Sequence, residues 1–430
     1  MIRERGTLRL LLATDHYPPF IGGAHRQSRL LATRMAERGH EVALATPWHR
    51  GLPARTEENG VEVHRVRQLR TAVTPLVRRG VQLHQPPFPD PISVWQLRRL
   101  IAEFEPEIIH TYGWISFSVA AAIGRRRIPL LVSARDYGYF CATRTLVEKG
   151  MPCSGPAPLK CLRCAGDYYG VPKGWLATAG VALSRPLLER RMTGLHSVSS
   201  YVREVTAKHL DGRRGGEGEP VEAVIPSFQG DAGAGEAPSE EVAAWLGRLP
   251  ASPFILFVGA FRKVKGLEVL FDAYGRLTSP PPLVLMGTFE RDSPHWFPPE
   301  AIVLNGVPHA AVMAAWDRAM FGVMPSLWPE PLGATVAEAM SRGRPVIGTR
   351  LGGHADMLDE RTGILVPQGD AAALTAAMSA LINDPDRCRA LGRAARERAT
   401  SFSAAQVLPR FERAYEETIS NHEGRERSKR

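Results

Sequence analysis

The most informative segment of this chain is Trp328-Pro-Glu330-Pro-Leu-Gly333-Ala-Thr335-Val-Ala-Glu338-Ala-Met-Ser-Arg-Gly-Arg-Pro-Val-Ile347. It places two carboxylates, Glu330 and Glu338, eight residues apart across an expected junction between a loop and a helix. Pro331 suits the first turn of that helix, because its missing N–H would have no partner there. The amides around Gly333 and Thr335 then lie at a helix start, which attracts anions. Eight helical residues rise roughly 12 Å, so the segment predicts an anion site between two carboxylates. An ordinary amphipathic helix with a proline-rich entry is the alternative.

Length and hydrophobic patterning indicate two α/β domains. A chain of 430 residues is long for one core, and short apolar runs alternate with helical patterns in both halves. The first half has expected strands at Leu8–Ala13, Val42–Thr46, Val61–Val66, Ile108–Thr111 and Leu130–Ser133. The second half has them at Phe254–Val258, Leu283–Met286, Ile302–Leu304, Gly322–Met324 and Pro345–Ile347. This alternation is typical of Rossmann-like domains. No Gly-x-Gly-x-x-Gly motif opens either half, so a nicotinamide or flavin site has little support.

The spacing of the two glutamates, followed by Ala-Met-x-x-Gly-x-Pro-Val, resembles the donor-site signature of glycosyltransferase family 4. The resemblance continues along nearly the whole chain in the family's order. Its other parts are the glycine-rich Pro19–Arg26 with Gly22 and Gly23, the Arg-Gly-His-Glu-Val run Arg38–Val42, the strand Pro106–His110 and the phosphate-gripping segment Val258–Leu267. A single match would be weak, whereas several in order are specific.

The resemblance implies an α/β protein of GT-B fold, with two Rossmann-like domains facing across a cleft. We expect an acceptor-side domain at residues 1–225 and a nucleotide-sugar-binding domain at 226–400. A terminal helix with a basic tail, at 401–430, is expected to cross back to the first domain. The first domain carries a cysteine-rich insertion at about 136–170. The segment Asp136–Cys141 resembles a cysteine-bearing loop of one branch of the family.

The resemblance also assigns roles around the donor. A nucleotide sugar carries a diphosphate whose charge grows as the glycosidic bond breaks, so its site needs cations and oriented N–H groups. By resemblance, Glu338 accepts hydrogen bonds from the ribose and Glu330 holds a hydroxyl of the transferred sugar. Phosphate contacts are expected from Lys265, from Arg262 in place of an arginine usual at position 260, from the amides of Leu332, Gly333 and Thr335, and from the backbone at Gly22 and Gly23. A solvated lysine and a plain glycine turn are the alternatives for Lys265 and the glycine pair.

One catalytic position departs from the family pattern. Relatives commonly end the strand after the Ile-Pro-Val segment in a histidine that reaches the reaction centre. The corresponding residue here is Arg135. An arginine is no neutral base, but it stabilises phosphate charge or orients a substrate. We therefore expect Arg135 and Glu330 to be the catalytic side chains.

Four of the five cysteines cluster after Arg135, at Cys141, Cys153, Cys161 and Cys164. The Cys-x-x-Cys spacing of the last two suits two thiolates on one tetrahedral metal. Disulfides are rare in the cytoplasm, so the cluster favours a structural zinc ion. A redox pair, an iron–sulfur cluster and free thiols stay open. No catalytic metal is expected, and Asp384-Pro-Asp386 is better interpreted as a helix start than as a metal ligand pair.

The net charge of +10 and the pI near 9.6 favour anionic partners. The basic residues Arg98, Arg99, Arg125, Arg126, Arg127, Arg190 and Arg191 lie in the acceptor-side half. They fit peripheral contact with an anionic membrane, although an arginine-rich background is an equal explanation. The region Trp175–Leu195 has apolar residues at helical spacing, for which core packing is the commoner explanation and membrane contact the alternative. No apolar run spans a bilayer, so we expect a cytoplasmic protein, at most peripheral at the inner membrane face.

The expected function is retaining transfer of a glycosyl unit from a UDP- or GDP-sugar to a hydroxyl. Acceptor candidates are a lipid-linked glycan, a polysaccharide precursor and a natural product. A nucleotide-sugar epimerase of the same architecture is one rival. A non-catalytic partner protein that binds nucleotide sugars is another, motivated by Arg135. Nucleic-acid binding is not expected, because no recognised module accompanies the basic charge.

Overall fold

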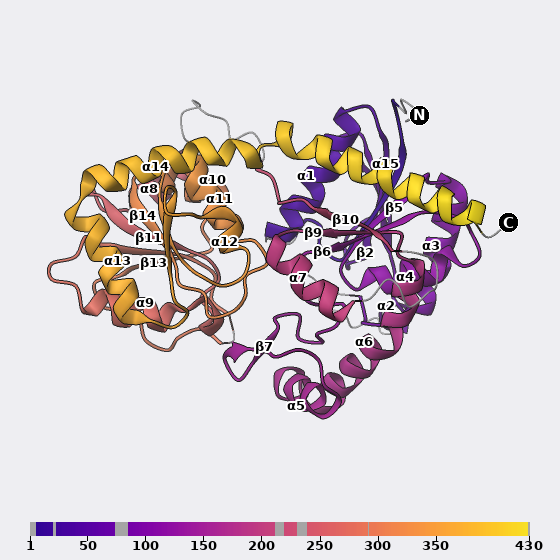
Figure 1. Ribbon diagram of the computed structural model, residues 1–430, viewed down its shortest axis with the longest axis horizontal. Coiled ribbons are helices and arrows are strands. Elements are labelled where there is room, and N and C mark those ends of the chain that lie inside the picture. The colour runs from indigo at the N-terminus through magenta and orange to yellow at the C-terminus, as the bar shows by residue number, and fades with distance from the viewer. Residues whose placement is uncertain are drawn as a thin grey trace. The chain divides into compact units, whose positions relative to one another are not determined.

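The computed structural model (Figure 1) describes residues 6–19, 23–73, 85–210, 219–229, 239–290 and 292–428. The chain divides into two compact units. Unit 1 comprises Met1–Leu146, Ser154–Pro226 and Val407–Arg430, and unit 2 comprises Val147–Cys153 and Ser227–Gln406. Gly22 lies outside the described residues.

Unit 1 is built on an eight-stranded sheet in the order β10-β9-β6-β5-β1-β2-β4-β3. All neighbours pair in parallel except β3 and β4, which pair antiparallel. The strands are β1 Arg9–Thr14, β2 Glu41–Pro47, β3 Arg55–Glu58, β4 Val61–Val66, β5 Ile108–Tyr112, β6 Leu130–Ala134, β9 Gly194–Ser197 and β10 Val221–Val224. The central strands β5 and β6 are buried along their whole length. Burial on both faces explains the continuous apolar runs from which these strands were predicted.

Helices flank this sheet on both faces (Figure 1). They are α1 Gly23–Glu37, α2 Leu69–Val73, α3 Pro91–Phe104, α4 Ile115–Ile123, α5 Pro158–Tyr169, α6 Val171–Arg191 and α7 Ser200–His209. The start of α3 shows how the sequence sets a boundary. The Asp90 carboxylate accepts a hydrogen bond from the Ser93 amide at 2.9 Å, and Pro91 occupies the first turn.

Unit 2 contains a six-stranded, all-parallel sheet in the order β13-β12-β11-β14-β15-β16. Its strands are β11 Phe254–Val258, β12 Leu283–Gly287, β13 Ile302–Asn305, β14 Ala319–Met324, β15 Val346–Thr349 and β16 Gly363–Val366. Its helices are α8 Glu240–Leu246, η2 Lys263–Lys265, α9 Leu267–Gly275, α10 His309–Trp316, α11 Ala334–Ser341, α12 His354–Met357, α13 Ala371–Asn383, α14 Pro385–Ala399 and η3 Thr400–Phe402. A short antiparallel hairpin, β7 Val147–Glu148 with β8 Met151–Pro152, also belongs to this unit. The two parallel sheets confirm the expected α/β class with two Rossmann-like domains.

The last helix, α15 Ala404–Ser428, returns to unit 1 from Val407 onward. Arg38 donates to both carboxylate oxygens of Glu412 at 2.6 and 2.7 Å. This confirms the expected terminal helix, which continues to Ser428 and so includes part of the expected basic tail. Arg425 of that tail donates a hydrogen bond to the Glu219 carbonyl. Within the described part of the chain, no helix is both long and apolar enough to cross a membrane.

Candidate active site

The first turn of α11 in unit 2 is an open helix start, by which we mean that no described side chain caps its backbone amides. Gly333 precedes it in the left-handed region, with φ 90° and ψ 73°. A Cβ on Gly333 would lie 2.8 Å from His354 Cδ2, so glycine is required here by conformation and by space. Thr335 directs its hydroxyl back to Met324 Sδ at 3.6 Å. The amides of this turn are therefore the groups that the helix presents to an anion.

The loop after β15 packs closely against the backbone of the segment that precedes α11. The Gly353 amide donates to the Glu330 carbonyl at 2.7 Å. A Cβ on Gly353 would lie 2.4 Å from the Pro331 carbonyl oxygen, so this approach excludes any larger residue. The backbone from Glu330 to Leu332, where the sequence predicts sugar and phosphate contacts, is thus held against a second loop.

Glu330 is a buried, ionised carboxylate. Only 8% of the residue is exposed, and its Oε1 accepts hydrogen bonds from Lys265 Nζ and, at 2.9 Å, from Ser326 Oγ. Burial alone would raise the pKa of Glu330, but the charges of Lys265 and His354 outweigh it and hold that pKa below its usual value. Lys265 Nζ also lies 5.4 Å from the centre of the Trp328 ring. Lys265, predicted as a phosphate ligand, is in this structure the ion-pair partner of Glu330.

Glu338 lies on α11 and is also buried, with 3% exposed. Its Oε1 accepts a hydrogen bond from His309 Nε2 at 3.0 Å. His309 is the first residue of α10, and 43% of its side chain is exposed. Sequence reasoning missed His309, because a single histidine without a motif around it gave no signal. The predicted Arg262 pairs with Asp292 at 3.0 Å and is half-buried.

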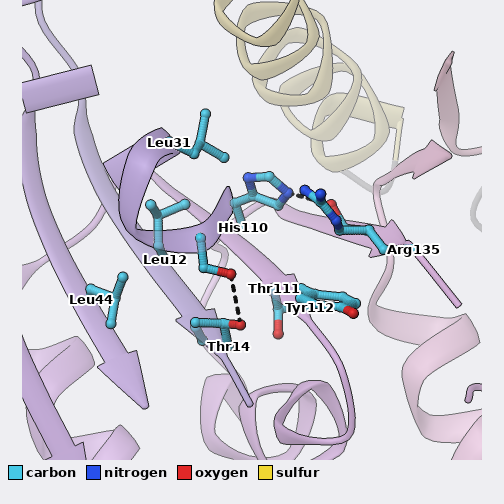
Figure 2. Close-up of a pocket in the computed structure, with 11 residues that line it drawn as sticks. Leu12, Thr14, Leu31, Leu44, His110, Thr111, Tyr112 and Arg135 are labelled. Atoms are coloured by element: carbon cyan, nitrogen blue, oxygen red, sulfur yellow. Dashed lines mark hydrogen bonds between the residues drawn. The ribbon is translucent and has the colours of Figure 1, made fainter. Parts of the chain in front are cut away.

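Unit 1 has a pocket at the carboxyl ends of β1, β5 and β6 (Figure 2). Figure 2 shows Thr14, His110, Tyr112 and Arg135 around it, each from one of these strands or the residue that follows. Arg135 follows β6 and is half-buried, and its Cζ lies 5.5 Å from the centre of the Tyr112 ring. Burial lowers the pKa of the Arg135 guanidinium, although nearby Tyr112 and Asp136 oppose the change. The sequence therefore placed Arg135 correctly at the end of a strand that lines a pocket.

A buried hydrogen-bond chain lies behind this pocket. His196 Nε2 is 2.7 Å from the Ile225 carbonyl oxygen, which can only accept, so this nitrogen carries the proton. His196 Nδ1 then accepts from Ser133 Oγ at 2.6 Å, and Ser133 accepts from His110 Nε2 at 2.6 Å. His110 Nδ1 finally accepts from the Tyr415 hydroxyl at 2.9 Å. Burial lowers the pKa of His196 to about 3 and that of His110 well below 6.5, so both rings are neutral. His110 therefore connects the sheet to α15, and its partners identify a structural role.

A second polar cluster joins the loops after β1, β5 and β6, and it was not predicted. The Asp15 carboxylate accepts from the amides of Trp114 and Ile115 at 2.6 and 3.1 Å. Burial raises the pKa of Asp15 to about 7. Arg144 donates to Asp136 at 2.5 Å and to His16 Nε2 at 2.9 Å. Among the predicted glycines on this side, Gly23 begins α1.

The cysteines do not form a ligand set in this structure. Cys161 and Cys164 lie on α5 and Cys141 lies in the loop after β6, all in unit 1, whereas Cys153 belongs to unit 2. Cys161 Sγ accepts from the Ala157 amide at 3.3 Å, and Cys141 Sγ lies 3.3 Å from Thr143 Oγ1. Among the residues that the structure describes, no three His, Cys, Asp or Glu side chains are grouped to hold a metal ion. The zinc ion stays a prediction.

Two family models match the chain, one in each half. Residues 22–215 match the glycosyl transferase 4-like domain, and residues 252–384 match the glycosyl transferases group 1 family. The first match covers β5, β6 and Arg135 but not β1, and the second covers Lys265, Glu330 and Glu338.

Similar proteins agree with these matches. The chain is 24% identical to a glycogen synthase of Mycobacterium tuberculosis (strain H37Rv), over 92% of this chain and 91% of that protein. It is 31% identical to the D-inositol 3-phosphate glycosyltransferase of Arthrobacter sp., over 40% of this chain and 46% of that one. Among solved structures, sucrose-phosphate synthase from Thermosynechococcus elongatus superposes with a TM-score of 0.72 at 19% identity, covering 96% of this chain and 99% of that one.

Anabaena Alr3699/HepE in complex with UDP-glucose superposes with a TM-score of 0.66 at 16% identity, covering 96% and 99%. At such identities the solved structures show the fold alone. Together with the family models and the sequence relatives, they make this chain a glycosyltransferase of the GT-B fold. The two-unit architecture agrees with that class.

Proposed function

We propose that the chain is a retaining glycosyltransferase of family 4 that transfers a sugar from a UDP- or GDP-sugar to a hydroxyl acceptor. The observation that carries this proposal is the ionised, buried Glu330 beside the open start of α11, with Glu338 eight residues further on. A buried carboxylate with a lysine partner is costly to maintain unless it binds something.

The geometry of unit 2 suits a diphosphate and two sugar rings. The amides of Leu332, Gly333 and Thr335 would donate hydrogen bonds to the phosphates at the helix start, where the helix dipole favours negative charge. The Glu330 carboxylate would accept a hydrogen bond from a hydroxyl of the transferred sugar, and Glu338 from the ribose. Lys265 already contacts Glu330, so it can share its charge between that carboxylate and the leaving phosphate as the glycosidic bond breaks.

Arg262 would contribute a second cation if the incoming diphosphate displaced Asp292, its present partner. In this proposal the growing charge is balanced by side-chain cations and amides, without a divalent metal ion. The relatives support the general class of donor, since Alr3699/HepE has been solved with UDP-glucose and starch synthase IV from Arabidopsis thaliana with ADP. UDP- and GDP-sugars should therefore be tested beside ADP-sugars.

Unit 1 would hold the acceptor. Arg135 projects from the end of β6 into the pocket with Tyr112, where its positive charge would orient the donor phosphate or the acceptor. The acceptor class includes lipid-linked glycans, polysaccharide precursors and natural products. A lipid-linked acceptor would agree with the exposed basic residues Arg98, Arg99, Arg125, Arg126, Arg127 and Arg190 of this unit, which favour contact with an anionic membrane at the inner face of the cell.

A structural zinc ion is a separate part of the proposal. Cys161 and Cys164 are three residues apart on α5, a spacing compatible with two ligands to one ion. Cys141 and Cys153 are the other two predicted ligands. Metal analysis of the purified protein and of Cys161→Ser tests this. Stoichiometric zinc lost in the variant supports the site, and equal metal content in both proteins rejects it.

The anomeric configuration of the product tests the proposed reaction. Proton NMR of fresh product from an α-linked UDP- or GDP-sugar should show an α-anomer, as retention requires. A β-anomer would contradict the proposal. An epimerase would convert the free nucleotide sugar without transfer, and a non-catalytic partner would bind the donor without releasing nucleoside diphosphate.

A further inference from the structure

The outward face of α6 is apolar. Six of its exposed positions are apolar and recur at helical spacing: Pro172, Trp175, Leu176, Ala179, Ala182 and Leu183; Lys173 is exposed among them. The large members of this set are strongly exposed, with Trp175 at 53%, Leu176 at 59% and Leu183 at 80%. These residues were expected to pack in a core, and that expectation is wrong for them.

The closest contacts on the inward face of the same helix are made by small residues. Gly174, Ala177, Gly180 and Ser184 are buried, together with the larger Val181 and Leu188. A Cβ on Gly174 would lie 2.2 Å from the Ala165 carbonyl oxygen on α5, and one on Gly180 would lie 2.9 Å from the Phe88 ring. A helix of a water-soluble protein normally turns its large apolar side chains inward. In α6 small residues make the closest contacts, Val181 and Leu188 are also buried, and Trp175, Leu176 and Leu183 face outward.

The apolar surface continues onto α5. Leu159 is 83% exposed and Tyr168 is 45% exposed. The Trp175 side chain reaches α5, because a Cβ on Gly166 would lie 3.8 Å from Trp175 Nε1. In Figure 1, α5 and the first half of α6 project from the body of unit 1. We call α5 and α6 together, residues 158–191, the helical hairpin.

The charge around this surface is basic. The helical hairpin contains six basic residues, Lys160, Arg163, Lys173, Arg185, Arg190 and Arg191, and two acidic ones, Asp167 and Glu189. Glu189 is 1% exposed and pairs with Arg185 at 3.4 Å, which leaves Asp167 as the exposed acid. None of the six outward positions of α6 listed above is charged. An apolar face with aromatic residues and flanking cations is typical of helices that lie in the interface of an anionic membrane.

We propose that the helical hairpin docks this protein on a bilayer that contains anionic lipid. Trp175, Leu176 and Leu183 enter the boundary between headgroups and acyl chains, while Arg163, Lys173 and Arg190 contact the headgroups. The inference rests on the proposed membrane contact and gives it a location. It does not depend on sugar transfer, so lipid binding and donor hydrolysis are measured separately.

Flotation with phospholipid vesicles tests this proposal on the full chain. One set of vesicles is phosphatidylcholine alone, and the other is an equal mixture with phosphatidylglycerol. The test variant is Trp175→Ser/Leu183→Ser, which changes two exposed positions. The matched control is Trp95→Ser, which removes a tryptophan of unit 1 that is 62% exposed on α3. Circular dichroism and donor hydrolysis verify that each variant is folded.

The wild type and Trp95→Ser should float with the anionic vesicles and bind the neutral ones more weakly. The double variant should bind the anionic vesicles at least about tenfold less, since burial of each large apolar side chain strengthens binding. Equal flotation of the double variant and the wild type would overturn the proposal, as would a wild type that binds neither vesicle. Self-association without lipid that the double variant abolishes would overturn it in favour of contact with a second copy.

Discussion

Removal of Lys265 should leave Glu330 as a buried charge without its cation. Glu330 is 8% exposed, and in the folded protein Lys265 and His354 keep its pKa below 4.5 in spite of burial. Breaking a buried ion pair on one side typically costs about 3 kcal/mol or somewhat more. Because a quarter of the Lys265 side chain is exposed, we expect Lys265→Ala to lower the free energy of unfolding of unit 2 by about 2 to 3 kcal/mol at pH 7.

The pH dependence of this loss has a definite sign. A carboxyl whose pKa is lower in the folded state contributes stability above its unfolded pKa, and this contribution disappears as the pH falls through the folded value. The difference in the free energy of unfolding between the wild type and Lys265→Ala should therefore be largest at pH 7. It should shrink below about pH 4.5, the usual pKa of a glutamate carboxyl. Urea unfolding at pH 7 and pH 4, followed by a probe in unit 2, measures both values.

Two comparisons make the result specific. Lys263→Ala removes an exposed lysine from the same short helix and should change stability by less than about 0.5 kcal/mol. In a Glu330→Gln background, Lys265→Ala should cost much less, because no buried charge remains. The reasoning is refuted if Lys265→Ala is as harmless as Lys263→Ala, or if its cost is the same in the Glu330→Gln background.

Three further predictions concern the two units separately. Gly333→Ala should destabilise unit 2 by about 1 to 2 kcal/mol, because φ is positive at this position. The same variant should weaken nucleotide-sugar binding, measured by calorimetry. The control is Gly275→Ala, where a Cβ would meet no atom within 4 Å, and it should change neither stability nor binding. Tyr415→Phe should lower the free energy of unfolding of unit 1 by about 1 to 3 kcal/mol, because His110 Nδ1 loses its donor, and an unchanged denaturation midpoint would contradict the assigned chain. Because the pKa of Asp15 is raised from 3.8 to about 7 on folding, the wild type should lose stability relative to Asp15→Asn as pH rises from about 4 to 7; a stability difference that is flat over this interval would disprove the shift.

The sequence was sufficient for ten of the fourteen strands in the two described large sheets, and it missed β3, β9, β10 and β16. A strand such as Phe254–Val258, buried at four of its five positions, is a continuous apolar run and is therefore visible in the sequence. The start of α14 was also predictable from the sequence. The Asp384 carboxylate accepts a hydrogen bond from the Arg387 amide and so caps the helix. Asp384 and Asp386 thus form the helix start that the sequence indicated.

The partners within the site were less predictable. Glu330 and Glu338 follow a recognisable spacing, but His309 reaches Glu338 from another helix, 29 residues earlier. Arg144 likewise reaches Asp136 and His16 from a loop. Such contacts depend on tertiary geometry and leave no periodic pattern in the sequence.

Which face of α6 is buried could not be predicted from the sequence either. Apolar residues at helical spacing are equally compatible with an inward and an outward face. What decides between them is the close approach of Gly174 to α5, a property of the packed structure. The expected core helix therefore became the candidate membrane surface.

Donor binding tests the central claim most directly. Binding and slow hydrolysis of UDP-, GDP- and ADP-sugars should be measured for the wild type, for Glu338→Ala and for the control Glu268→Ala, an acidic residue at the start of α9. We predict that the wild type binds and hydrolyses the sugars of one nucleotide. Glu338→Ala should weaken donor binding and donor hydrolysis by at least about tenfold, equivalent to roughly 1.4 kcal/mol. Glu268→Ala should change neither binding nor hydrolysis. A wild type that binds no nucleotide sugar, or a Glu338→Ala variant that binds and hydrolyses its donor as well as the wild type, would contradict the assignment of this site.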